Sequence, residues 1–325
     1  MSEDSAGSSG RTSSASAGPA GNRPPRPIPI KERSSYVWLS MGRLDVEDGA
    51  FVLADAQGTR VQVPVGMLTC LFLEPGTVVT HAAVALAARV GCLLIWTGEG
   101  GVRFYAAGQP GGARSERLLH QARLALDDDL RLAVVRKMYQ LRFGEAAPSR
   151  RSLDQLRGIE AARVKRTYEL LAQRFGVRWV RRSYDPARGG SLGSDLPNVC
   201  LSAANACLYG VCEAAILAAG YAPAIGFLHT GKARSFVFDV GDVVKFDLVA
   251  PIAFKVAAAN PANPEREVRL ACRDAFRSSG VLKRLVPLVE DILTVEGVAP
   301  PAPPPEALPV AFEDEEATGD AGHRA

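Results

Sequence analysis

The residues best suited to chemistry lie in one stretch, residues 225–247, where His229, Asp239 and Asp242 are interspersed with large apolar residues. A buried carboxylate or imidazole is destabilising unless a partner compensates it, and a metal ion is one such partner. The sequence holds only four histidines, and His229 lies between an apolar run and a Gly-Lys turn. We therefore expect the rest of the protein to close a metal site around this stretch.

A further candidate ligand, Glu160, lies in the predicted helix of residues 152–175. It occupies a position on the apolar stripe of that helix, where the pattern asks for an apolar residue. That stripe is formed by Leu153, Leu156, Val164, Thr167 and Leu171. The alternative role is structural, an ion pair with Arg157 or Arg163. The pattern leaves both roles open.

Asp239 and Asp242 are three residues apart, so on a helix they lie on the same side. Asp239 has an alternative role as the N-cap of the helix that follows it. One imidazole and one or two carboxylates, joined by Glu160, form a mixed nitrogen and oxygen ligand set. Such a set suits Mg²⁺ or Mn²⁺ better than zinc held by thiolates. With a phosphate substrate, that metal would polarise the phosphoryl oxygen and stabilise the leaving alkoxide.

A basic ridge is predicted on the helix of residues 265–277, because four arginines recur there at helical spacing. They are Arg266, Arg269, Arg273 and Arg277. A solvated charged face is the alternative, but few acidic residues interrupt that line, which favours contacts with a nucleic-acid backbone. Lys232 places a further positive charge beside His229, and Arg103 completes the predicted DNA-binding set.

Composition and charge narrow the class of protein. The chain has 325 residues, of which 47% are hydrophobic and 22% charged, as in ordinary globular proteins. From Glu296 onward seven acidic residues oppose Arg324 alone, so the remaining chain carries 37 basic and 28 acidic residues, a balance of +9. This excess favours a polyanionic partner. No phosphate-binding P-loop, dinucleotide-binding glycine motif or G-x-S-x-G elbow is present.

The six cysteines have no zinc-binding spacing, and with no signal peptide a reducing cytoplasm is the expected location. Residues 206–228 are apolar enough to suggest a membrane span. However, Glu213 lies within them and the Gly-Tyr-Ala-Pro sequence at 220–223 breaks the helix. We therefore predict a buried helix and no membrane association.

The expected fold class is α+β, with a small β-rich domain over residues 28–107 followed by an all-helical domain over residues 108–295. Residues 1–27 and the Pro-rich acidic tail, 296–325, are expected to be disordered. Strands are predicted at 36–39, 50–53, 61–63, 70–73, 92–96 and 102–105, and a helix at 81–90. Later helices are predicted at 198–219, 265–277 and 282–293, and one apolar stripe runs from Leu118 to Leu141.

Several of these segments resemble a known family. They include Gly-Gln-Pro-Gly-Gly-Ala-Arg at 108–114, Arg-Gly-Ile-Glu at 157–160, His-Thr-Gly-Lys at 229–232 and Glu-Val-Arg-Leu-Ala-Cys-Arg-Asp at 267–274. The sequence closely resembles the type I-E form of CRISPR-associated protein one, over almost the whole chain outside the N-terminal extension. The resemblance implies a β domain followed by a helical catalytic domain, and a metal held by Glu160, His229 and Asp242. Asp239 is then a nearby acidic helper.

The resemblance also implies a homodimer that assembles with CRISPR-associated protein two and binds double-stranded DNA. The expected function is a metal-dependent DNA endonuclease and integrase of CRISPR adaptation, with the same three residues and Asp239 as its catalytic set. A 3′-hydroxyl of a captured spacer precursor would attack a phosphodiester of the CRISPR repeat. Two other functions stay open, a catalytically silent DNA-binding scaffold and a general repair nuclease with no CRISPR role.

Overall fold

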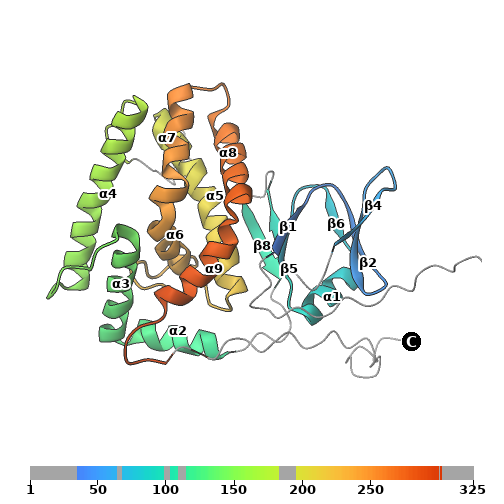
Figure 1. The fold of residues 1–325 in the computed structure, drawn as a ribbon, viewed down its shortest axis with the longest axis horizontal. Coiled ribbons are helices and arrows are strands. Elements are labelled where there is room, and N and C mark those ends of the chain that lie inside the picture. The colour runs from blue at the N-terminus through green and yellow to red at the C-terminus, as the bar shows by residue number, and fades with distance from the viewer. Residues whose placement is uncertain are drawn as a thin grey trace, which may run out of the picture.

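The structure is a computed structural model that describes residues 35–63, 68–98, 103–108, 115–182, 195–299 and 301. The predicted disordered segment 1–27 lies outside the described residues, as does nearly all of the predicted tail 296–325. Strands form the first part of the chain and helices the second, and the two parts lie side by side (Figure 1). The predicted α+β class is confirmed.

Two four-stranded sheets make up the first part. One has the order β1-β5-β7-β8 and the other the order β4-β3-β2-β6. The strands of the first sheet are β1 (Ser35–Leu39), β5 (Leu68–Leu73), β7 (Leu93–Thr97) and β8 (Phe104–Gly108). The strands of the second are β2 (Gly42–Glu47), β3 (Ala50–Ala54), β4 (Arg60–Val63) and β6 (Thr77–Val79). The pairs β1/β5, β5/β7 and β2/β6 are parallel, and the other neighbours are antiparallel.

The strands β2 and β6 are absent from the sequence-based prediction. Most side chains of β2 are at least partly exposed, and β6 is three residues long, so neither gives the apolar run by which the other strands are predicted. The helix α1 (His81–Val90) has the predicted bounds. Thr80 caps its first turn by accepting from the Ala83 amide, and Gly91 ends it in the left-handed conformation at φ 67°.

Eight further helices follow among the described residues. They are α2 (Glu116–Leu126), α3 (Asp128–Phe143), α4 (Leu153–Phe175), α5 (Leu196–Ala218), α6 (Ser235–Leu248), α7 (Ala250–Ala259), α8 (Pro264–Ser279) and α9 (Val281–Ile292). The predicted stripe from Leu118 to Leu141 is not continuous. Asp127 separates α2 from α3 in an extended conformation and caps α3, and Leu126 is 85% exposed at this corner.

The central helix is α5, which contacts α6, α7, α8, α9 and strands of the first sheet. Among the described residues it alone is long and apolar enough to cross a membrane, but 72% of its apolar window is buried inside the protein, as in a core helix. Phe72 and Ile95 of the sheet share one core with residues of α5 such as Leu208. The strands and helices therefore support each other, and the proposed domain boundary at residues 107 and 108 stays a prediction.

Candidate functional site

The loop before α6 is organised by Asp239, whose side chain is fully buried. Its carboxylate accepts hydrogen bonds from the backbone amides of Phe227 at 2.6 Å, Leu228 at 3.2 Å and His229 at 2.9 Å. The alternative role of Asp239 as a helix N-cap is wrong, because the residue lies inside α6. A carboxylate with several amide donors is well compensated in the interior, so Asp239 fixes the loop from beneath.

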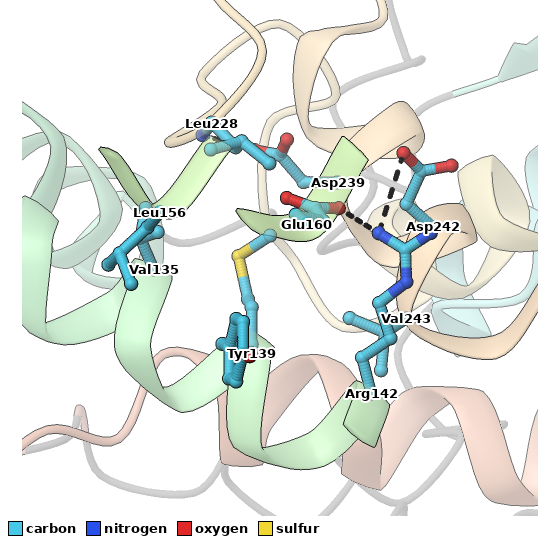
Figure 2. Close-up of a pocket in the computed structure, with 10 residues that line it drawn as sticks. Val135, Tyr139, Arg142, Leu156, Glu160, Leu228, Asp239, Asp242 and Val243 are labelled. Carbon is cyan, nitrogen blue, oxygen red and sulfur yellow. Dashed lines mark hydrogen bonds and ion pairs between the residues drawn. The ribbon is translucent and has the colours of Figure 1, made fainter. Parts of the chain in front are cut away.

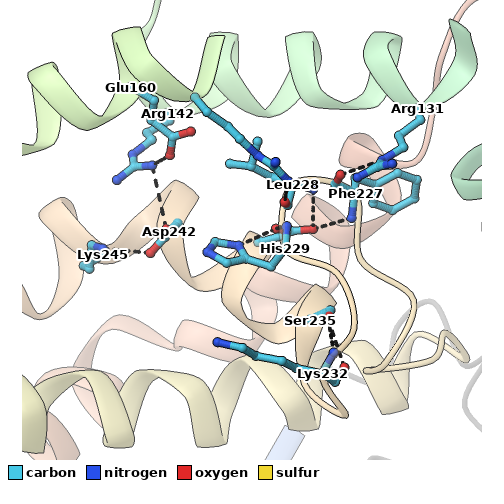
Figure 3. Close-up of polar contacts among 12 residues, drawn as sticks. Arg131, Arg142, Glu160, Phe227, Leu228, His229, Lys232, Ser235, Asp242 and Lys245 are labelled. Atoms are coloured by element: carbon cyan, nitrogen blue, oxygen red, sulfur yellow. Dashed lines mark hydrogen bonds and ion pairs between the residues drawn. The ribbon is translucent and has the colours of Figure 1, made fainter. Parts of the chain in front are cut away.

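The imidazole of His229 is oriented by the same carboxylate. Its Nδ1 lies 2.7 Å from Oδ1 of Asp239, and the side chain is 36% exposed. When Nδ1–H donates to Asp239, Nε2 keeps its lone pair and is free to bind a ligand. Figure 3 shows the ring directed toward Asp242. The pair Asp239 and His229 thus presents one nitrogen donor to the site.

Side chains from three earlier helices hold the carbonyl groups of this loop. Arg131 of α3 donates to the Phe227 carbonyl at 2.7 Å, and Arg157 of α4 donates to that of Leu228. Gln121 of α2 donates to two further carbonyls, those of residues 222 and 225. At Gly226 a Cβ atom would collide with the carbonyl oxygen of His229 and with Ser235, so only glycine fits there. The loop conformation is therefore fixed from both sides.

Glu160 projects from α4 into the same region and pairs with Arg142 of α3. The structure thus gives Glu160 a partner other than the two proposed from the sequence. Arg157 lies near Asp154 instead, and Arg163 pairs with Glu145. The Glu160 side chain is 16% exposed and that of Arg142 only 4% exposed, so this ion pair is largely shielded from water.

Asp242 lies on α6 one turn after Asp239, as the three-residue spacing predicts. Its carboxylate accepts from Nζ of Lys245 at 2.7 Å and lies 4.0 Å from Nη1 of Arg142. Burial alone would raise the pKa of the Asp242 carboxyl, but Lys245 and Arg142 outweigh burial and hold that pKa below its ordinary value. Asp242 is therefore ionised at neutral pH.

Arg142 lies between the two carboxylates, as Figure 2 shows in the small pocket that Glu160, Asp239 and Asp242 help to line. Burial lowers the pKa of its guanidinium, while the charge of Asp242 opposes that change. Arg142 is a site residue that was not predicted from the sequence. Its spacing of four residues from buried Met138 is the signal that could have placed it on the inner face of α3.

The predicted metal ligands fit Mg²⁺ or Mn²⁺ in their chemistry. Glu160 and Asp242 supply carboxylate oxygens and His229 supplies Nε2, the mixed set expected for such ions. Within the described part of the chain, no three acidic, histidine or cysteine side chains are grouped closely enough to bind a metal as they stand. The guanidinium of Arg142 separates the two carboxylates instead. The metal assignment therefore stays a prediction.

Comparison with known proteins gives the family of the chain. The family described as CRISPR associated protein Cas1 matches residues 141–266. A CRISPR-associated endonuclease Cas1 of Escherichia coli K12 is 62% identical over 301 residues, covering 93% of this chain and 98% of that protein. One from Geobacter sulfurreducens is 60% identical with the same coverage. The chain belongs to the Cas1 family. The family recognised from the sequence is thus confirmed.

A solved Cas1 structure supports the fold. The crystal structure of a TtCas1–DNA complex matches with a TM-score of 0.72 at 40% identity, covering 81% of this chain and 97% of that one. Within this Cas1 family fold, the segments that carry Glu160, His229 and Asp242 are α4, the loop before α6 and α6 itself. Three segments far apart in the sequence thus meet at one place.

The residues predicted to bind DNA come from three separate segments of this Cas1 family member, namely the loop before α6, the segment just before β8 and helix α8. Lys232 follows the His229 loop and lies over the Phe238 ring at 5.7 Å. Arg103 is exposed immediately before β8. The predicted ridge on α8 carries more nearby acidic groups than its spacing indicated. The pairs are Arg266–Glu267 at 3.9 Å, Arg269–Glu265 at 3.7 Å, Arg273–Asp274 at 2.8 Å and Arg277–Glu74 at 3.5 Å. DNA binding by these residues stays a prediction.

Proposed function

We propose that this Cas1 family member is a metal-dependent DNA endonuclease and integrase of CRISPR adaptation, which inserts short DNA fragments into a CRISPR array. One observation carries the proposal. Glu160 of α4 and Asp242 of α6 line one small pocket, and the His229 ring, which Asp239 orients, is directed toward Asp242 from the loop between α5 and α6. Relatives at 60% and 62% identity over 93% of the chain are CRISPR-associated endonucleases, which supports the same chemistry here.

In the proposed reaction the 3′-hydroxyl of a DNA end attacks a phosphodiester of the repeat. A new P–O bond forms to that oxygen, and the bond to the 3′-oxygen of the repeat strand breaks. The attacking hydroxyl loses a proton, and the departing oxygen gains one. Water in place of the hydroxyl gives hydrolysis. The barrier is lowered mainly by positioning the two DNA segments and by fixed charges around the phosphate.

Each site residue has a proposed role. Glu160, Asp242 and Nε2 of His229 would hold Mg²⁺ or Mn²⁺, which when bound polarises the phosphoryl oxygen and stabilises the leaving oxygen. Asp239 keeps the imidazole and its loop in place through bonds at 2.6–3.2 Å. Lys232, Arg103 and the arginines of α8 would contact the DNA backbone. The crystal structure of the related TtCas1 with DNA supports DNA binding by this fold as a whole.

We also propose a homodimer that assembles with CRISPR-associated protein two on double-stranded DNA, in the cytoplasm. Membership of the Cas1 family supports this assembly, and the positive charge of the chain outside its tail supports contact with DNA. Light scattering of the purified chain, alone and mixed with that companion protein, tests it. A monomer at micromolar concentration that gains no mass on mixing would contradict the assembly.

The catalytic assignment is tested by integration of labelled DNA with the companion protein present. His229→Ala is expected to abolish integration while thermal unfolding stays close to that of the wild type, and EDTA is expected to abolish wild-type integration. The matched control is His81→Ala, because His81 is an exposed histidine of α1 remote in sequence from the site. Normal integration by His229→Ala would show that the metal-site assignment is wrong, and integration that survives EDTA would count against a metal-dependent enzyme and favour a DNA-binding scaffold.

A further inference from the structure

The guanidinium of Arg142 occupies the centre of the proposed metal site. It comes from the last turn of α3, and its Nη1 pairs with Glu160 while lying 4.0 Å from Oδ2 of Asp242. Figures 2 and 3 both show it between the two carboxylates. These are the oxygens that a divalent ion would need. The guanidinium of Arg142 therefore lies where the proposed function places the divalent metal ion.

The remaining contacts of Arg142 are unusual for a buried arginine. Its Nε and Nη2 are buried and have no hydrogen-bond partner among the described residues. The group lies over the rings of Phe143 at 5.3 Å and Phe246 at 5.5 Å. An arginine normally uses its fork of donors to bind carboxylates through two nitrogens. Here Nη1 alone lies near both carboxylates, so two of the three guanidinium nitrogens of this buried cation make no hydrogen bond to any described residue.

Charge explains why a cation is needed at this position in the metal-free protein. Glu160 and Asp242 would otherwise bring two negative side chains, 16% and 18% exposed, into one poorly hydrated pocket. Lys245 compensates Asp242 alone, at 2.7 Å. Arg142 is the group that both carboxylates share, so it offsets their mutual repulsion. Once a divalent ion binds the same oxygens, the guanidinium becomes a like charge at close range.

We propose that Arg142 is a resident counter-cation that holds Glu160 and Asp242 together in the metal-free protein and is displaced when the metal binds. This inference rests on the proposed function. Arg142 acts through the two carboxylates and is therefore a positioning residue, and its contact with them sets the affinity for the ion. A purely structural arginine predicts the opposite sign: its loss would disorder the ligands and weaken metal binding.

Mn²⁺ binding to the purified full-length protein, measured by the electron paramagnetic resonance signal of free Mn²⁺, tests the proposal. Arg142→Gln is expected to bind Mn²⁺ roughly tenfold more tightly than the wild type, because one competing charge is gone. Its metal-free form is expected to melt lower, and its melting temperature to rise more with Mn²⁺. The control is Arg163→Gln, since Arg163 also pairs with a glutamate and lies over the Tyr139 and Phe143 rings, and its affinity is expected to be unchanged. Unchanged or weaker binding by Arg142→Gln overturns the proposal.

A second measurement avoids any loss of folding in that variant. The Nε–H resonance of Arg142 in the ¹⁵N-labelled wild type, assigned by its absence from Arg142→Lys, is followed as Mg²⁺ is added. The proposal expects this resonance to shift as the site fills, and a resonance that stays in place while Mg²⁺ binds overturns it. Glu160→Gln distinguishes a failure of the proposed role of Arg142 from a failure of the proposed function. If the wild type binds Mn²⁺ no better than Glu160→Gln, the proposed function fails, whatever Arg142 does.

Discussion

At the scale of single residues, the buried carboxylate of Asp239 receives four hydrogen-bond donors from the loop that carries His229. Three of the donors are backbone amides and the fourth is the imidazole Nδ1. One side chain thus sets the path of the loop and the ring nitrogen that faces the site. Histidine ligands of metal sites commonly have such a partner, and its loss weakens binding or activity about 10–100-fold.

Asp239→Asn should therefore test how much the orientation of the His229 ring matters, because it leaves the three proposed metal ligands in the sequence. An amide cannot accept from all four donors, so at least one buried donor loses its partner, and the free energy of unfolding is expected to fall by about 2–4 kcal/mol. Integration should fall by about 10–100-fold because the imidazole is no longer held. Urea unfolding and the integration assay measure the two effects. The control Asp154→Asn changes an aspartate that is 89% exposed and should alter neither. An Asp239→Asn variant with wild-type activity would contradict the role.

Site residues could be predicted from the sequence only where a polar residue interrupts an apolar segment. His229, Asp239 and Asp242 are conspicuous because they interrupt apolar residues, and Glu160 because it interrupts a helical stripe. Arg142 gives no such contrast, since arginines are frequent in the segment around it. Its partners are 18 and 100 positions away in the chain, beyond the reach of any local pattern.

At the scale of elements, capping residues predict the ends of α1 and α4 well, whereas apolar spacing does not reveal the break between α2 and α3. Thr80 and Gly91 bound α1, and Ser152 begins α4 with a complete capping box, because caps depend on a few adjacent residues. The break at Asp127 was missed, because the apolar spacing continues from Leu126 to Leu130 across two separate helices. The polar cap at Asp127 is the signal that marks the corner.

Two glycines, Gly226 in the loop before α6 and Gly158 inside α4, give a prediction at the scale of elements. Gly226→Ala is expected to destabilise the protein by more than 1 kcal/mol and to displace His229, because the new methyl group meets backbone and cannot be relieved by a rotamer change. Gly158→Ala, inside α4 with open space around its Cβ position, should stabilise by about 0.5–1 kcal/mol through helix propensity. Thermal unfolding of both variants measures the contrast. Equal effects of the same sign would contradict the proposed close contact.

At the scale of the whole molecule, the order of strands could not be derived from the sequence. In the sheet β1-β5-β7-β8, the parallel pairs β1/β5 and β5/β7 join strands that are not consecutive within that part of the chain or are separated by a helix, and β2 pairs with the distant β6. Such pairing is decided by which apolar faces are covered, and α5 covers one face of this sheet. The fold class could be predicted, because the strand signals come before residue 108 and nearly all of the helix signals come after it.

Charge at this scale is divided between the tail and the rest of the chain. Residues 302–325 contain six acidic residues and one arginine, which leaves 37 basic and 29 acidic residues, a balance of +8, when they are removed. A polyanionic segment on a DNA-binding protein competes with DNA for positive groups, and such competition is strongest at low salt. If the chain binds DNA as proposed, this acidic tail is expected to weaken that binding.

Deleting residues 302–325 should raise the affinity for duplex DNA about 3–10-fold at roughly 50 mM salt, and the difference should vanish near 0.5 M. Fluorescence anisotropy with labelled duplex measures both. A full-length variant with the six tail acids changed to amides is the matched control, because it keeps the length and removes the charge. If charge is the cause, this variant binds DNA as tightly as the truncated chain. If it binds like the wild type while the truncated chain binds more tightly, the tail acts through its bulk, and the electrostatic explanation is wrong.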